Sequence, residues 1–120
     1  MADLSFTRHH RLLTPAAFKT VFDHADYRAG GAHVLLLARE NGGLPARLGL
    51  VVGKRRVRHA VARNRIKRHG RESFRLRCQA LCGLDVVLLV KSPWPRPAPA
   101  ELNTELARLW DKLLAKRGQA

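Results

Sequence analysis

The segment VARNRIKRHGRESFR, residues 61–75, is strongly basic, yet it keeps a stripe of small and apolar side chains at helical spacing. At about 100° per residue, one side of a helix would carry Ala62, Ile66, Gly70, Ser73, Leu76 and Ala80. The opposite side would carry Asn64, Lys67, Arg68, Arg71 and Arg75, with Arg63 and Arg65 at the margins. We therefore predict a long helix over about residues 59–81 that packs on a sheet through its apolar side and turns its basic side outward.

The residues before this helix predict a short helix followed by strands. Thr14 and Pro15 have the residue types of an N-cap and a first helical position, so a helix should run to about residue 22. Residues 23–31 suit a short strand or a loop. Residues 32–40 and 46–53 are apolar strands separated by the turn NGGLP, and this pattern favours an antiparallel hairpin.

The residues after the long helix complete an α+β pattern. LDVVLLVK, residues 84–91, is the most apolar strand and is expected at the centre of the sheet. A proline-rich connector at 92–99 is non-helical, and leucines at helical spacing predict a last helix over 98–116. We expect one domain over residues 1–120 with a flexible basic segment at 1–12. The order α-β-β-β-α-β-α predicts a two-layer sandwich of helices on a sheet.

The charge balance indicates a polyanionic partner. The chain has 23 lysines and arginines, 17 of them arginine, against 9 acids, which gives a net charge of +14. Between Lys54 and Arg77 eleven basic residues face one acid, Glu72. Charge of this density repels itself unless an anion neutralises it, and arginine matches phosphate geometry. Binding should weaken steeply as salt rises. A crowded but merely solvated face in a basic domain is the alternative.

Other features exclude several classes of function. The acids are dispersed, and no nucleophile-base pattern, glycine-rich phosphate loop or zinc spacing occurs. Glu101 and Glu105 share a helix face, where solvated acids are commoner than a metal site, so we expect neither catalytic nor metal-binding residues. No apolar run suits a membrane span or a signal peptide. We interpret Cys78 and Cys82 as small buried or half-buried residues of a cytoplasmic protein.

A family resemblance is carried by GKRRVRHAVARNRIKRHGRESFR, residues 53–75, which resembles the signature segment of the bacterial ribonuclease P protein subunit. RLLTPAAFKTVF, residues 11–22, resembles the family's pattern of Arg-Leu followed by Phe-x-x-Val-Phe. The late apolar strand and the final amphipathic helix follow in the same order. The resemblance covers about residues 5–116.

The resemblance implies a protein cofactor for a catalytic RNA that removes the 5′ leader from precursor tRNA, with Mg²⁺ held mainly by the RNA. It implies partners of two kinds, the catalytic RNA and precursor tRNA, and no obligate protein partner. It also implies a mixed sheet with a left-handed βαβ crossover. The residues implied to contact the catalytic RNA are Lys54, Arg55, Arg63, Asn64, Arg65, Lys67, Arg68, Arg71 and Arg75. Those implied to form the leader cleft are Phe18, Val21, Phe22, Val34 and Leu36.

Two other classes of function compete with this interpretation. A structural RNA-binding protein, such as a ribosomal protein, would explain the charge but not the combination of the basic signature with an aromatic first helix. On pattern alone Phe18 and Phe22 are more typical of a core than of a base-stacking surface. A freestanding nuclease would gather acids around metal ions, and the dispersed acids argue against it.

Overall fold

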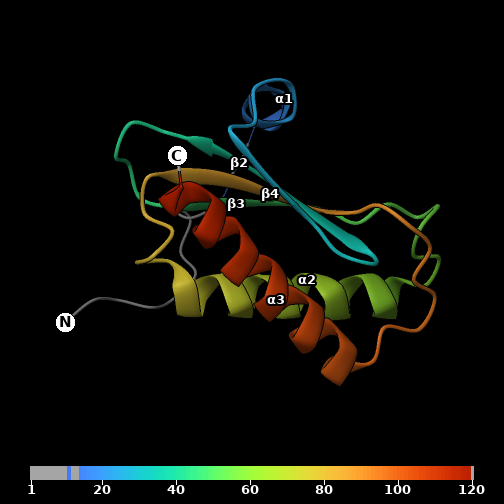
Figure 1. Ribbon diagram of the computed structural model, residues 1–120. Helices are drawn as coiled ribbons and strands as arrows, with labels where there is room; N and C mark the ends of the chain where they lie inside the picture. The colour runs from blue at the N-terminus through green and yellow to red at the C-terminus, as the bar shows by residue number, and fades with distance from the viewer. Residues whose placement is uncertain (1–10, 12–13, 120) are drawn as a thin grey trace.

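The computed structural model describes residue 11 and residues 14–119, and its element order is the predicted one (Figure 1). The elements are α1 (Pro15–Asp23), β1 (Tyr27–Gly30), β2 (Val34–Glu40), β3 (Arg47–Val51), α2 (Ala60–Arg77), β4 (Leu84–Val90) and α3 (Pro99–Gly118). The predicted flexible segment 1–12 lies outside the described residues, apart from Arg11. Every helix in the described ranges is too short or too polar to cross a bilayer.

The four strands form one mixed sheet in the order β1-β2-β4-β3. β4 runs antiparallel to β2 and parallel to β3, so the prediction of a hairpin between β2 and β3 is wrong. The reason is burial: β4 is buried along nearly its whole length, because helices cover both of its faces and strands β2 and β3 flank both of its edges. The prediction that this strand is central is confirmed. The β3–α2–β4 crossover joins parallel strands, and its left hand stays a prediction.

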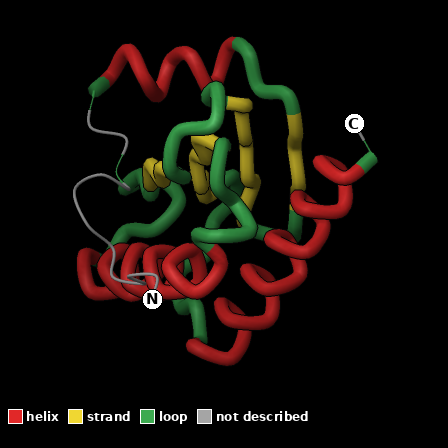
Figure 2. The backbone as a smooth tube through the Cα atoms, turned by 90° about the vertical axis from the view of Figure 1, so that its left-hand side faces the viewer, coloured by secondary structure: helices red, strands yellow, loops and turns green. Residues whose placement is uncertain are grey.

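Helices cover both faces of the sheet (Figure 2). α2 and α3 pack on one face over the main core, which contains Ile66, Phe74 and Trp110. α1 lies on the opposite face, where Val21 packs with Leu37 and Val87. The α+β class and the mixed sheet are confirmed, and α1 adds a short third layer to the predicted two.

α2 docks through a narrower stripe than the helical wheel indicated. Its buried residues are Ala62, Ile66, Gly70 and Phe74, which follow each other at intervals of four. Leu76, predicted to pack, has 58% of its surface exposed, because the stripe drifts around the helix and reaches Phe74 instead. The helix also ends at Arg77, four residues early, so Cys82 is exposed while Cys78 is buried, and both are free thiols.

β1 forms one edge of the sheet, and α3 crosses beside it. The backbone groups of β1 alternate between β2 and the outside. The outward carbonyls of Gly30 and Arg28 accept hydrogen bonds from Lys112 and Lys116, which lie one turn apart on α3. Arg117 of the same helix also pairs with Glu40 at the end of β2. The last helix is therefore fastened along the β1 side of the sheet.

Candidate nucleic-acid interface

The basic side of α2 is held outward by close contact on its other side. A Cβ built at Gly70 would lie 3.2 Å from side-chain atoms of both Leu50 and Leu88, so the helix backbone approaches the sheet where glycine leaves room. Ile66, one turn earlier, is fully buried. With the inner stripe fixed in this way, the intervening basic residues face the surface.

The structure brings the residues expected to contact RNA onto the outer side of α2 and the loop before it. Exposed members of the set are Lys54, Arg55, Asn64, Arg65 and Arg68, whereas Arg63, Lys67, Arg71 and Arg75 are half-buried. The α2 N-terminus has no side-chain cap and no acid in its first turn. This end of the helix therefore adds the positive pole of its dipole to the positive charge of the side chains.

Three arginines of the set have partners within the protein. Arg63 Nη1 donates to the carbonyl oxygens of Val57 and Arg58, at 3.0 and 2.8 Å, which ties the helix to the loop. Arg65 Nη1 donates to the Pro97 carbonyl at 3.3 Å. These three bonds go to neutral carbonyls, so among the described residues they leave the positive charge of both guanidiniums uncompensated.

Arg75 differs from the rest of the set because it is paired with an acid. Its Nε donates to a Glu72 carboxylate oxygen at 3.1 Å, and its Nη2 donates to the other. The hydrogen bonds hold the pKa of Glu72 below its usual value and raise the pKa of Arg75. Among the described residues, Lys54, Arg55, Lys67, Arg68 and Arg71 form no ion pair with a carboxylate. Most of the predicted surface is thus free to neutralise an external anion.

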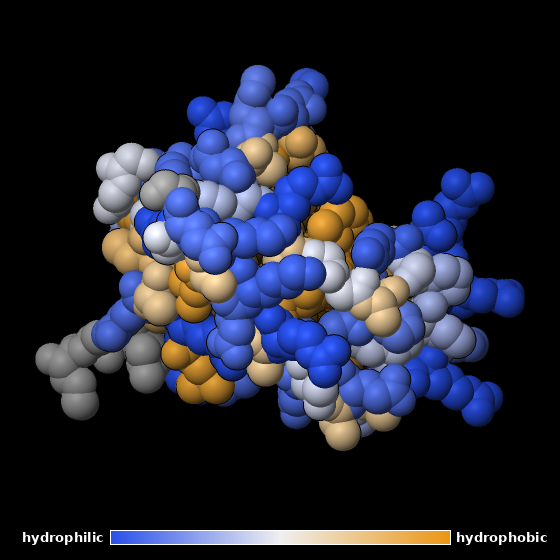
Figure 3. Space-filling model, in the orientation of Figure 1, coloured by the Kyte–Doolittle hydropathy of each residue, from blue (hydrophilic) through white to orange (hydrophobic). Residues whose placement is uncertain are grey.

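A second candidate region is a groove of about 340 Å³ between α1 and the sheet. It is lined by Phe22, Asp23, Ala25, Arg28, Leu35, Leu37 and Leu89. Phe22 has 42% of its surface exposed, whereas Phe18 is half-buried in the small core under α1. Hydrophobic surface lies just beneath α1, framed by hydrophilic side chains (Figure 3). The groove therefore offers an aromatic ring and an apolar floor with one cation, Arg28.

The expected cleft residues of β2 require a correction. Val34 and Leu36 are fully buried in the main core on the α2–α3 face, so they cannot line a cleft with α1. Successive side chains of a strand point to opposite faces, and Leu35 and Leu37 point toward α1 instead. The sequence shows that alternate residues of β2 share a face, but it does not show which of the two sets faces α1. Val21 belongs to this face, but it is buried in the small core and is not among the residues that line the groove.

Several residues of these surfaces were missed from the sequence. Arg28 and Leu89 join the groove from β1 and β4. Arg96 lies in the connector between β4 and α3, which hydrogen-bonds to the basic loop before α2, residues 52–59. Their sequence neighbours carry no motif, so only the pairing of distant segments could have identified them. The described part of the chain has no group of three or more His, Cys, Asp or Glu residues suited to a metal ion.

Comparisons with known proteins agree on one family. The Ribonuclease P family model matches residues 6–114. The ribonuclease P protein component of Alcanivorax borkumensis is 49% identical over 116 residues, which is 97% of this chain and 96% of that protein. That of Pseudomonas entomophila is 45% identical over 117 residues, or 98% of this chain and 88% of that protein.

Solved structures share the fold. The Staphylococcus aureus RNase P protein has a TM-score of 0.76 at 21% identity, covering 86% of this chain and 94% of that one, which supports the fold alone. The Thermotoga maritima RNase P protein has a TM-score of 0.59 at 27% identity, covering 88% and 92%. Together with the family match and the close relatives, these findings show that the chain belongs to the ribonuclease P protein family.

Proposed function

We propose that this chain binds the catalytic RNA of ribonuclease P and the 5′ leader of precursor tRNA, and thereby promotes endonucleolytic removal of the leader. The observation that carries the proposal is the row of half-buried and exposed cations along α2, such as Lys67, Arg68 and Arg71, that form no ion pair with any carboxylate the structure describes. Because the chain belongs to the ribonuclease P protein family, the RNA proposed to bind this surface is the ribonuclease P RNA. The proposed complex needs no further protein subunit.

The proposed role of α2 is electrostatic. Two RNA molecules repel each other where they meet, and Lys67, Arg68 and Arg71 lower that repulsion by displacing counterions from phosphates. Because these side chains emerge from a helix fixed at Gly70 and Ile66, they need little reorganisation on binding. Of the nine residues expected from the resemblance, Arg75 is the least available, since Glu72 already balances its charge.

The proposed role of the groove under α1 is to hold the single-stranded leader. Exposed rings stack on unpaired bases without reading sequence, and Phe22 offers such a ring. Arg28 stands beside it as a cation for the leader backbone. Only the precursor has a leader, so this contact would distinguish substrate from product. The apolar floor of the groove consists of Leu35, Leu37 and Leu89 rather than the expected Val34 and Leu36.

The proposed chemistry resides on the RNA. The family implies Mg²⁺, but the described residues offer no cluster of carboxylates or histidines that fits a protein-held ion. We therefore assign no catalytic step to a side chain of this protein, and Mg²⁺ would be bound mainly by the RNA. The contribution of the protein is then binding and orientation of the precursor.

Reconstitution tests the proposal directly. Precursor tRNA is incubated at low Mg²⁺ with the protein, with the ribonuclease P RNA, and with both. We expect leader removal to be slow with RNA alone, absent with protein alone, and markedly faster with both. Cleavage by the protein alone would transfer the chemistry to this chain. An RNA whose turnover is unchanged by the protein would refute the subunit function.

A further inference from the structure

The proline-rich connector between β4 and α3 lies against the basic loop that precedes α2. The backbone N–H of Trp94 donates to the Arg56 carbonyl at 3.0 Å. The two segments run side by side at the right of Figure 1, although about 40 residues separate them in sequence. The connector therefore borders the surface that we propose for RNA.

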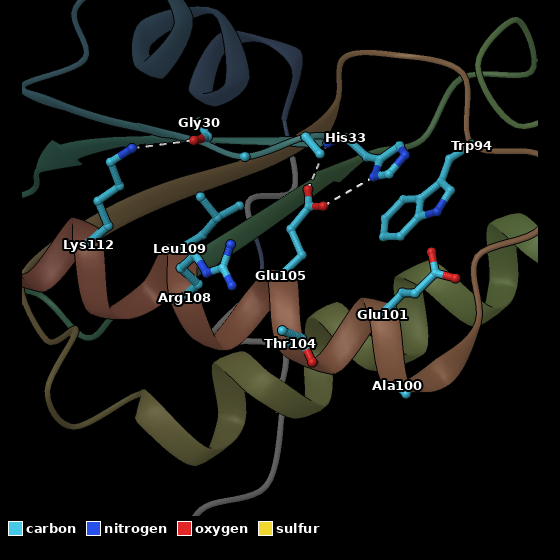
Figure 4. A pocket seen from close by; sticks show the side chains of 12 residues that line it. Gly30, His33, Trp94, Ala100, Glu101, Thr104, Glu105, Arg108, Leu109 and Lys112 are labelled. Atoms are coloured by element: carbon cyan, nitrogen blue, oxygen red, sulfur yellow. Dashed lines mark hydrogen bonds and ion pairs between the residues drawn. The ribbon is translucent and has the colours of Figure 1, made fainter.

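Trp94 is a fixed anchor for the connector (Figure 4). Its residue is only 3% exposed, and its ring stacks on the His33 ring with centroids 4.2 Å apart and an interplanar angle of 6°. Glu105 of α3 holds His33 in turn: one carboxylate oxygen lies 3.1 Å from Nδ1, and the other accepts from the His33 backbone N–H at 2.9 Å. The position of Trp94 is thus fixed by the loop before α2, by His33 between β1 and β2, and, through His33, by α3.

The other end of the connector is anchored to α2. Pro97 is buried, and its carbonyl accepts the hydrogen bond from Arg65. Between the two anchors lie only Pro95 and Arg96, both exposed. The prolines on either side of Arg96 restrict the backbone to a narrow range of φ. Arg96 is therefore presented outward from a short, doubly anchored span.

Arg56, Arg65 and Arg96 come together from a loop, a helix and the connector. All three are exposed, and within the described ranges none of them forms an ion pair with an acid. Like charges gathered on one surface repel each other and carry a cost unless an anion lies against them. The rigid backbone around Arg96 also lowers the entropy lost when its side chain binds.

We propose that the connector is part of the RNA-binding surface and that Arg96 binds a phosphate of the ribonuclease P RNA. This inference rests on the proposed function and extends it to a segment outside the basic signature. It predicts a phosphate contact beyond the start of α2, on the side where α3 begins.

The test compares Arg96→Ala with Arg108→Ala and Arg68→Ala by measuring the Kd for the ribonuclease P RNA at several salt concentrations. Arg108 is a matched control, because it is an exposed arginine on α3, about 14 Å along the helix from its start. We expect Arg96→Ala to weaken binding roughly threefold to tenfold and to lower the salt slope by about one. Arg108→Ala should match the unaltered protein, and Arg96→Lys should restore most of the slope.

A second measurement detects proximity rather than energy. An iron chelate tethered to Arg96→Cys, in a Cys82→Ser background, should cut the bound RNA at a discrete position, because the remaining Cys78 is buried. If Arg96→Ala behaves like Arg108→Ala and no cut appears, the inference is overturned while the effect of Arg68→Ala still supports the proposed function. If Arg68→Ala is also silent, the proposed function fails with it.

Discussion

Gly70 of α2 lies against Leu88 of β4 so closely that a Cβ at position 70 would stand 3.2 Å from Leu88 Cδ1. Leu88 is fully buried at the centre of the sheet, so it has little room to move aside. The contact sets the distance of the basic helix from the sheet.

Enlarging position 70 should loosen this docking. Gly70→Val adds three side-chain carbons at a position where even a single Cβ would be crowded. We expect the free energy of unfolding to fall by about 1–3 kcal/mol. Urea unfolding measures the change. Arg68→Val is the matched control, because it introduces the same side chain on the exposed side of the same helix. Equal stability of the two variants would mean that the helix does not rely on close approach at Gly70.

Replacing a cation of α2 should weaken RNA binding more when that cation has no acidic partner among the described residues than when it has one. Lys67→Ala and Arg68→Ala should each lower the affinity for the ribonuclease P RNA and reduce the salt slope by about one. Arg75→Ala should have a smaller effect, because Glu72 shares its charge. Binding isotherms at several salt concentrations provide both quantities. A loss for Arg75→Ala as large as that for Arg68→Ala would contradict this ranking.

Phe22→Ala should separate precursor from product. The exposed ring can be removed with little loss of core packing, and one lost base stack is worth about 1–3 kcal/mol. We expect the reconstituted enzyme to bind precursor tRNA more weakly while its affinity for mature tRNA is unchanged. Circular dichroism checks that the variant is folded. Equal losses for the two tRNAs, or a loss of the helical signal, would return Phe22 to a core role.

Acid should weaken the attachment of α3 to the sheet. Arg117 donates to both carboxylate oxygens of Glu40, at 3.0 and 3.1 Å, and these bonds hold the pKa of Glu40 below its usual value of 4.5. A carboxyl with a lowered pKa in the folded state binds fewer protons there than in the unfolded chain. Its stabilisation is therefore complete above the unfolded pKa and disappears as the pH falls through the folded value.

Glu40→Gln tests that pH dependence. The variant should lose stability near neutral pH and show a shallower decline of melting temperature below about pH 4.5. Glu101→Gln serves as the control for the loss of one negative charge, since no ion pair of Glu101 occurs among the described residues. Identical pH profiles for Glu40→Gln and the unaltered protein would exclude this contribution.

Local patterns predicted the elements well, because caps, periodicity and apolar runs act over a few residues. Thr14 caps α1 as expected, accepting a hydrogen bond from the Ala17 N–H at 3.1 Å. The basic side of α2 also followed from periodicity. What failed depended on distant partners: β4 enters between β2 and β3, and the phase of β2 relative to α1 is set by packing across the sheet.

The same limit explains the candidate site. Arg63 to Arg71 share one helix, so their grouping is local and visible in sequence. The groove takes Phe22 from α1, Leu35 from β2 and Leu89 from β4, and this gathering depends on strand order. Arg96 joins the basic surface because the connector is bonded to Arg56 through Trp94 and to Arg65 through Pro97.

The lysines of α3 that bond to Gly30 and Arg28 have a further consequence. A strand from another molecule that paired with the β1 edge would have to capture its outward carbonyls, and those of Gly30 and Arg28 are already bonded to two long cationic side chains. The lysines therefore protect this edge of the sheet against pairing with the edge of another molecule.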